Sequence, residues 1–435
     1  MKLSRIGRIS KAFVVSMAVV LGMSACGGYT IGFMWVVGTQ YSQIAGFKID
    51  DHTGNLTATV NSPYASGGAN PVSIAVRVGG NYVFVVNKGT VNSSGVSNHD
   101  GNVAVFEVGE DGILTYQLSY PTAGGTPIWA ASDGTGNYLY VLDAQSPAYG
   151  TLVNGVTDLN GDITVFSIDG TTGRLQLVPN QLIKNAAGQQ LNYFEVGEAP
   201  ITLRYSGSCI YTLDSGNQTA STPVYPSIYP YGVGSSGQLV IEPISSIPIA
   251  AAPGAALIKP TSINTGGSNV YVTDAAPVPA SGTTAASPGG RVLPYSAGAN
   301  CSLNVQADGP VDNLPLTADP VFALADSKGK YLYVVNQGNT NSNYANSTIS
   351  AFVIQSTGAL LPISDVNNPY PVGNGPTCMI EDPSNQYVFT SNMNDGTVTG
   401  KIINQNTGQI SDLPRGSSFS ATGMAACLVV SGTVD

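Results

Sequence analysis

The chain has 435 residues, of which 10% are charged and 52 are glycine, and its formal net charge is −10 at pH 7. This acidic balance argues against a nucleic-acid partner, because binding to phosphates needs clustered Lys and Arg. Few charges and many glycines favour short strands and tight turns, and no long apolar stripe of helical period follows the first 25 residues.

The first 25 residues have the layout of a secretory signal peptide. A basic stretch precedes the apolar run AFVVSMAVVLGM, which is too short for a spanning helix. The run ends at Ser24-Ala25-Cys26-Gly27, which resembles the lipoprotein signal of two-membrane bacteria, where Cys26 would be diacylated and become the mature N-terminus. An ordinary signal peptide cleaved near Ala25 is the alternative.

The lipoprotein interpretation predicts three parts. They are a signal peptide at 1–25, a lipidated N-terminus and short tether at 26–32, and a folded domain at 33–435. Removing the signal leaves 12 Lys and Arg against 26 Asp and Glu, a net charge near −14. Gly27 after the cysteine resembles lipoproteins sent to the outer membrane, so we expect attachment through the lipid on Cys26, facing the periplasm or the cell surface.

An aromatic-rich segment that ends in Asn or Asp recurs six times, as in NYVFVVN and KYLYVVN. The terminal residues are Asn87, Asp143, Asp214, Asp274, Asn336 and Asn392. A proline opens a short apolar segment 14 or 16 residues before each of them: Pro71, Pro127, Pro200, Pro260, Pro320 and Pro376. An alternating strand and a glycine-containing hairpin turn follow. Each repeat therefore predicts a four-stranded antiparallel meander.

The two ends of the chain supply the parts of a seventh repeat. FMWVVG and QIAGFKIDDHTGNL provide the second, third and fourth strands, and GMAACLVV at 423–430 provides only a first strand. Joining them predicts an all-β fold, a seven-bladed β-propeller whose ring is closed by N- and C-terminal strands.

The fit is weakest in the fourth and fifth repeats. Pro226 and Pro230 lie in the expected third strand of the fourth repeat, and Pro294 lies at the same place in the fifth. Because proline cannot donate to a ladder, these strands are predicted to be irregular, bulged or displaced outward.

One face of the predicted ring carries the six prolines, the six Asx residues and the long, unequal loops that follow them. We call it the Asx face and expect any binding site there, around the central channel. The six Asx side chains have two interpretations. They could bind a cation or a polyol, or each could cap the backbone of the next loop as an Asx-turn, which the repetition favours.

Charged residues that do not repeat are more specific candidates for a site. Arg204 lies within a first strand, and Glu198, Lys259, Asp319 and Glu381 flank others, where they would line the axial opening or form a solvated rim. The loops NHDGN and DLNGD have calcium-like compositions, but turn chemistry explains both better. We expect no metal site and no cofactor.

Four cysteines remain besides Cys26, and an oxidising periplasm allows two disulfides or four buried thiols. Cys209, Cys301, Cys378 and Cys427 allow three connectivities, and Cys378 and Cys427 are the favoured pair because they fall in equivalent strands of neighbouring repeats.

The repeated runs, with the following strand and a TGxL hairpin, resemble the lactonase-type seven-bladed propellers, a family similar to 6-phosphogluconolactonase and related to the YVTN surface-layer repeats. The resemblance covers residues 33–430. It implies a possible lactone hydrolase, yet the family's histidines in the opening turns of certain first strands are missing here, and Arg204 is the only basic candidate.

Two functions follow. The first is a non-catalytic envelope lipoprotein, expected to be a monomer, whose loops bind a protein, peptide or glycan. The Tyr-rich segment 221–236 favours it. The second is a divergent lactonase that uses Arg204, Glu198 and Glu381.

Overall fold

The computed structural model describes residues 29–432 except 154–155, 185–187, 253, 281–288, 307–310, 312–318 and 339–345. The described chain is almost entirely β, with one short 3-10 turn at Ala299–Cys301, and none of its helices could cross a membrane. The signal peptide and Cys26 lie outside the described residues, so lipid attachment stays a prediction.

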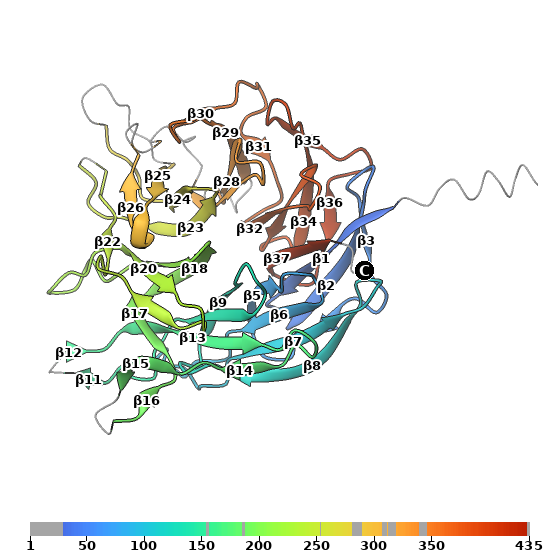
Figure 1. Ribbon diagram of the computed structural model, residues 1–435. Helices are drawn as coiled ribbons and strands as arrows, with labels where there is room; N and C mark the ends of the chain where they lie inside the picture. The colour runs from blue at the N-terminus through green and yellow to red at the C-terminus, as the bar shows by residue number, and fades with distance from the viewer. Residues whose placement is uncertain are drawn as a thin grey trace, which may run out of the picture.

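Seven sheets of mainly four antiparallel strands stand in a ring (Figure 1). We number the blades from the one that contains the first strand and give strands from the channel outward. Blade 1 contains β37 (Ala425–Gly432), β1 (Thr30–Gly38), β2 (Gln43–Asp50) and β3 (Leu56–Ala58), with β4 (Tyr64–Ala65) also on β2. Blade 2 contains β5 (Pro71–Val76), β6 (Tyr82–Asn87), β7 (Asn102–Val108) and β8 (Leu114–Pro121).

The next two blades carry insertions. Blade 3 contains β9 (Pro127–Ser132), β10 (Tyr138–Asp143), β13 (Asn160–Ile168), β14 (Leu175–Leu177) and β17 (Phe194–Glu198). Two small hairpins extend from it: β11 (Leu152–Val153) with β12 (Val156–Thr157), and β15 (Asn180–Lys184) with β16 (Gln190–Leu191). Blade 4 contains β18 (Pro200–Ser206), β19 (Cys209–Asp214), β20 (Ser227–Val233), β21 (Leu239–Ile241) and β22 (Ile247–Pro248).

The last three blades are more regular. Blade 5 contains β23 (Pro260–Gly266), β24 (Asn269–Asp274), β25 (Arg291–Ala297) and β26 (Leu303–Val305). Blade 6 contains β27 (Pro320–Ala325), β28 (Tyr331–Asn336), β29 (Thr348–Ile354), β30 (Leu360–Pro362) and β31 (Tyr370–Pro371). Blade 7 contains β32 (Pro376–Glu381), β33 (Tyr387–Asn392), β34 (Thr397–Ile403), β35 (Ile410–Asp412) and β36 (Ser418–Ser420).

The repeat predicted the inner strand boundaries. The six prolines are the first residues of the innermost strands of blades 2 to 7, and the six Asx residues end the second strands. Proline is tolerated at the first position of a strand because its missing N–H interrupts no ladder.

The ring closes as predicted. β1 pairs along its length with β37, with Trp35 opposite Val429, so the two differently coloured ends of the chain lie side by side (Figure 1). The first strand begins at Thr30, three residues before the expected start at Phe33. The indole of Trp35 is fully buried and donates a 3.1 Å hydrogen bond to the carbonyl of Gly112 in blade 2.

The prediction of irregular third strands in blades 4 and 5 is wrong. β20 and β25 pair with their inner neighbours without a register shift, with Pro230 opposite Tyr211 and Pro294 opposite Tyr271. The carbonyl of Pro294 accepts a bond from the outer residue Gln306. Since N and C=O of one residue lie on the same side of an antiparallel strand, the missing N–H also faces outward and the inner ladder stays intact.

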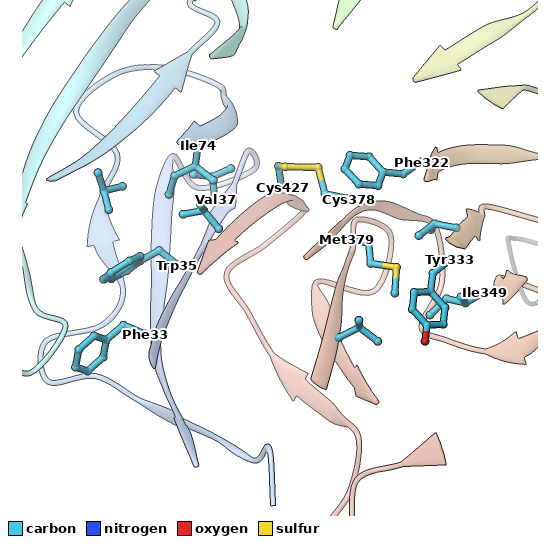
Figure 2. Close-up of a cluster of buried hydrophobic side chains, with 14 of the residues drawn as sticks. Phe33, Trp35, Val37, Ile74, Phe322, Tyr333, Ile349, Cys378, Met379 and Cys427 are labelled. Atoms are coloured by element: carbon cyan, nitrogen blue, oxygen red, sulfur yellow. A yellow bond between two sulfur atoms is a disulfide. The ribbon is translucent and has the colours of Figure 1, made fainter. Parts of the chain in front are cut away.

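Two disulfides join neighbouring blades. Cys378 is bonded to Cys427, which links the innermost strands of blades 7 and 1, and Cys209 is bonded to Cys301, which links blades 4 and 5. Figure 2 shows the Cys378–Cys427 bond between Ile74 on one side and Phe322 on the other, inside the largest buried apolar cluster. This is the pairing that the register of the repeats favours.

Candidate functional site

Every innermost strand contains a bulge one residue after its start. In all seven blades the ladder between the first and second strands skips one residue: Val72, Ile128, Ile201, Thr261, Val321, Thr377 and Ala426. A bulge takes a side chain out of the pleat and aims it in a new direction. We call these seven residues the collar.

The collar residues face the central channel. Each is partly exposed, although the preceding residue in its strand is buried. An innermost strand has the second strand on its outer side and neighbouring blades across both faces, so the solvent that it reaches lies in the channel and at the channel's two ends. Because the bulges lie at the strand starts, the collar surrounds the Asx-face end of the channel.

The chemistry of the collar is nearly inert. Five of the seven side chains are Val, Ile or Ala, and the two hydroxyls are engaged with the following blade. Thr261 donates a 2.7 Å bond to the carbonyl of Pro320, and Thr377 donates a 2.5 Å bond to that of Ala426. The collar therefore offers neither a general base nor a free donor for an oxyanion.

Arg204 reaches the channel from β18. Its guanidinium lies 4.3 Å from the ring centroid of Trp129 in blade 3 and 5.3 Å from that of Phe322 in blade 6. Nε donates a 2.8 Å bond to Oδ1 of Asn264 in blade 5, and Nη1 donates to Thr202 at 3.1 Å. Only a side chain that extends across the channel can touch innermost strands from three other blades.

No carboxylate pairs with Arg204 among the described residues. Burial lowers the pKa of Arg204 to about 9, and nearby charges make no contribution. The two aromatic rings supply partial stabilisation through cation–π contacts. Burying the guanidinium without a carboxylate costs desolvation free energy, and an anionic ligand would offset that cost.

The other two catalytic candidates do not join Arg204. Glu198 is at the end of β17 on the Asx face, whereas Glu381 is at the other end of β32, on the opposite face. Burial raises the pKa of Glu381 to about 7. Its carboxylate accepts a 2.7 Å bond from the backbone of Ser327 and another from the amide of Asn385, so it fastens two hairpins together.

Lys259 and Asp319 are at the Asx-face rim. Each precedes the proline that begins an innermost strand, and their Nζ and Oδ1 atoms are 3.4 Å apart across blades 5 and 6. Lys259 is mostly exposed, so this ion pair contributes little stability. Both residues are placed to meet a ligand that approaches the mouth of the channel.

The six Asx side chains lie inside the blades. None is more than 1% exposed: Asn87, Asp143, Asp214, Asp274, Asn336 and Asn392. The Asp274 carboxylate accepts a bond from the backbone N–H of Ala276, which is the expected Asx-turn. In four blades, however, the side chain also bonds to the first residue of the third strand, directly across the ladder.

These cross-strand pairs differ from blade to blade. Asn87 donates to Asn102 at 3.0 Å, Asn336 to Thr348 at 3.2 Å, and Asn392 to Thr397 at 3.0 Å. In blade 5, Arg291 donates a 2.9 Å bond to the carboxylate of Asp274, and both are buried. The choice between Asn and Asp thus follows the chemistry of the partner.

Blade 4, with Asp214 opposite Ser227, and blade 3 depart from this rule, and blade 3 places Asp143 opposite Asp162. Both are fully buried, and burial raises the pKa of Asp143 to about 7 and that of Asp162 well above its ordinary value, with repulsion between the two carboxylates adding to the second shift. Thr122 and the backbone of Thr126 donate to Asp143 at 2.6 and 2.9 Å. Desolvation also raises the pKa of Asp214 to about 8.

The two calcium-like loops carry local turn bonds. Asp100 accepts bonds from the backbone and hydroxyl of Thr90, and Asp158 accepts one from the backbone N–H of Asn160. Across the described residues, no three His, Cys, Asp or Glu side chains gather as metal ligands.

The sequence located Arg204 and the rim but not the collar. The residue after each repeated proline is apolar or Thr, and this shared position was visible in the repeat. Nothing in a single sequence shows that the strand bulges there, because the bulge depends on how the first strand meets the second.

Residues 30–180 match the family model described as Lactonase, 7-bladed beta-propeller. Among solved structures, a putative 6-phosphogluconolactonase from Bacteroides fragilis is 17% identical, with a TM-score of 0.66 over 92% of this chain and 98% of that one. The periplasmic gluconolactonase of Pseudomonas aeruginosa is 15% identical, with a TM-score of 0.64 over 93% and 100%. No protein of curated function matches. The chain therefore has a lactonase-type seven-bladed propeller fold.

Proposed function

We propose that this lactonase-type propeller is a lipid-anchored envelope protein that binds a protein, peptide or glycan through its Asx face without hydrolysing lactones. The collar is the observation that carries the proposal. It places apolar side chains and two engaged threonines around the channel, where a hydrolase needs a base and an oxyanion donor.

The surrounding architecture supports binding. The unequal loops of the Asx face extend from a rigid ring closed by a strand ladder and a disulfide. The Tyr-rich segment contributes less than its composition suggested, because its second half forms the regular strand β20.

A divergent lactonase is the second candidate, and Arg204 favours it. The channel holds one cation without a carboxylate partner in the described chain, and the similar structure from Pseudomonas aeruginosa is a periplasmic gluconolactonase. A sugar-acid lactone or its product could use the guanidinium, although Glu198 and Glu381 lie at opposite ends of their blades and supply no base beside it.

Lactone hydrolysis separates the two candidates. The protein from residue 27 onward is expected to leave the hydrolysis of glucono-δ-lactone and 6-phosphogluconolactone at the uncatalysed rate. Acceleration that Arg204→Ala abolishes would establish the lactonase instead.

Binding is tested on arrays of immobilised glycans and peptides. Lys259→Glu at the Asx-face rim should weaken binding, whereas Lys328→Glu in a hairpin of the opposite face should not. Equal effects of the two charge reversals would remove the Asx face as the binding surface. For the anchor, labelling with a radioactive fatty acid should be lost in Cys26→Ser.

A further inference from the structure

A pocket of about 340 Å³ lies at the seam between blades 1 and 7. Residues 41–47, 58–63 and 420–423 contribute its lining. Two of these segments connect to β1 and β37 at the ends that carry the Asx residues in other blades, so the pocket opens on the Asx face. Its volume is within the range of small-molecule sites. We call it the seam pocket.

Strand alternation builds one wall of the seam pocket. Gln43, Ala45 and Phe47 are alternate residues of β2, so their side chains share one face of the blade. Phe47 is 6% exposed and belongs to an apolar cluster that also contains Leu413 of blade 7, which shows that this face is turned toward that blade. Blade 7 supplies the opposite wall through Ser420 and the residues that follow it.

Tyr41 forms an aromatic platform at the edge of the pocket. Its side chain is 61% exposed. Gly423 has a φ of +58°, and a methyl group there would lie 2.9 Å from Cδ2 of Tyr41. One edge of the ring thus lies against the glycine backbone, and most of the side chain is open to solvent. An exposed aromatic ring at the edge of a pocket is suited to stacking on a ligand.

The side-chain amide of Gln43 is oriented so that its Nε2 can donate a hydrogen bond to a ligand. Thr422, which is buried, donates a 2.6 Å bond to Oε1 of Gln43 and fixes which end of the amide is free. Within the described chain no acceptor receives Nε2 of Gln43. Ser420 adds an exposed hydroxyl at the same rim.

The lining of the seam pocket contains no charged residue, which disfavours a phosphate, carboxylate or ammonium ligand. We infer that it binds a neutral pyranose ring of a glycan. The apolar C–H face of such a ring would stack on Tyr41, and its hydroxyls would accept from Gln43 and exchange bonds with Ser420. This inference rests on the proposed binding function and identifies one ligand class for it.

The test uses ligand-observed NMR on the mature protein with two neutral probes, methyl β-D-glucopyranoside and cellobiose, and with gluconate as an anionic comparator. Neutral probes are expected to bind with a Kd on the order of 1–10 mM, as for small ligands with few contacts. Tyr41→Ala and Gln43→Ala should each weaken binding by about fivefold or more. Tyr29→Ala is the matched control, since Tyr29 is 77% exposed on the same blade and lies outside the pocket.

Four outcomes overturn the inference. If neither neutral probe binds, or if Tyr29→Ala weakens binding as much as Tyr41→Ala, the seam pocket is not the site. If only gluconate binds and Arg204→Ala abolishes it, the channel is the sugar-acid site. If peptides bind at Tyr41 while sugars do not, the ligand class is wrong but the binding function stands, so the two failures can be told apart.

Discussion

Asp143 and Asp162 face each other across β10 and β13, at the position where other blades pair Asn with Asn, Asn with Thr, Asp with Arg, or Asp with Ser. Two fully buried carboxyls in this place must retain at least one proton, because both cannot ionise at close range without large cost. The pair makes the stability of blade 3 depend on pH.

We therefore predict that Asp162→Asn increases the free energy of unfolding relative to wild type, and that this increase is larger at pH 8 than at pH 5. The pKa of Asp143 is raised to about 7 and that of Asp162 further, so the folded state keeps protons that the unfolded chain releases above about pH 4. The contribution of the protonated pair to the free energy of unfolding is fully present below that pH. It is lost as the pH rises through the folded pKa values. Urea unfolding of wild type and variant at both pH values should show a relative gain on the order of 2 kcal/mol at pH 8. An equal difference at the two pH values would contradict this account.

The ion pair of Asp274 and Arg291 allows a repair experiment. Arg291→Thr should destabilise the protein by about 3–5 kcal/mol, because it leaves a buried carboxylate without its partner. Adding Asp274→Asn reproduces the Asn336 and Thr348 pair of blade 6 and should recover most of the loss. Denaturant unfolding of both variants measures the loss and the recovery. If the second substitution destabilises the protein further, the choice between Asn and Asp does not follow the partner across the ladder.

Replacing Arg204 with Met should leave the protein as stable as wild type or raise its stability by about 1–2 kcal/mol. The guanidinium is desolvated without a carboxylate, and an apolar side chain of similar length can keep the packing against Trp129 and Phe322. Thermal and urea unfolding provide the readout. A loss above about 1 kcal/mol would mean that Arg204 is a structural clamp through its bond to Asn264 rather than a group retained for a ligand.

Removing the disulfide at the seam tests the ring closure. The Cys378→Ser and Cys427→Ser double variant should lose about 4 kcal/mol of unfolding free energy, the entropic value for a loop of 49 residues. The Cys209→Ser and Cys301→Ser double variant is the control, with a similar entropic term from its separation of 92 residues. Since the seam also depends on the noncovalent ladder of β1 and β37, only the first variant should become hypersensitive to proteolysis between blades 7 and 1. Cleavage elsewhere first would refute this.

Most of the fold could be predicted from the sequence because the sequence repeats. The prolines and Asx residues fall at strand boundaries in six blades, and the two chain ends complement each other as one blade. The outer parts were less predictable. Pro230 and Pro294 predicted irregular, bulged or displaced strands. Each instead has its missing N–H on the outer side of its strand, and a sequence does not show which way a strand residue faces its neighbours.

The site was harder to predict than the fold. Arg204 stood out because it interrupts an apolar strand, but its aromatic neighbours come from blades 3 and 6 and no spacing indicates that contact. The seam pocket joins residues near 43 and 422, which only the closed ring brings together.

Closure by β37 also sets the order in which the protein can fold. This strand is the last of the propeller to leave the ribosome, and blade 1 lacks its innermost member until then, with the apolar faces of Trp35 and Val37 uncovered. Blades 2 to 6 can assemble as the chain emerges, but the ring cannot close until β37 is present. The ring thus stays open along one seam until β37 is made, and the disulfide between Cys378 and Cys427 can form only once this last strand is present.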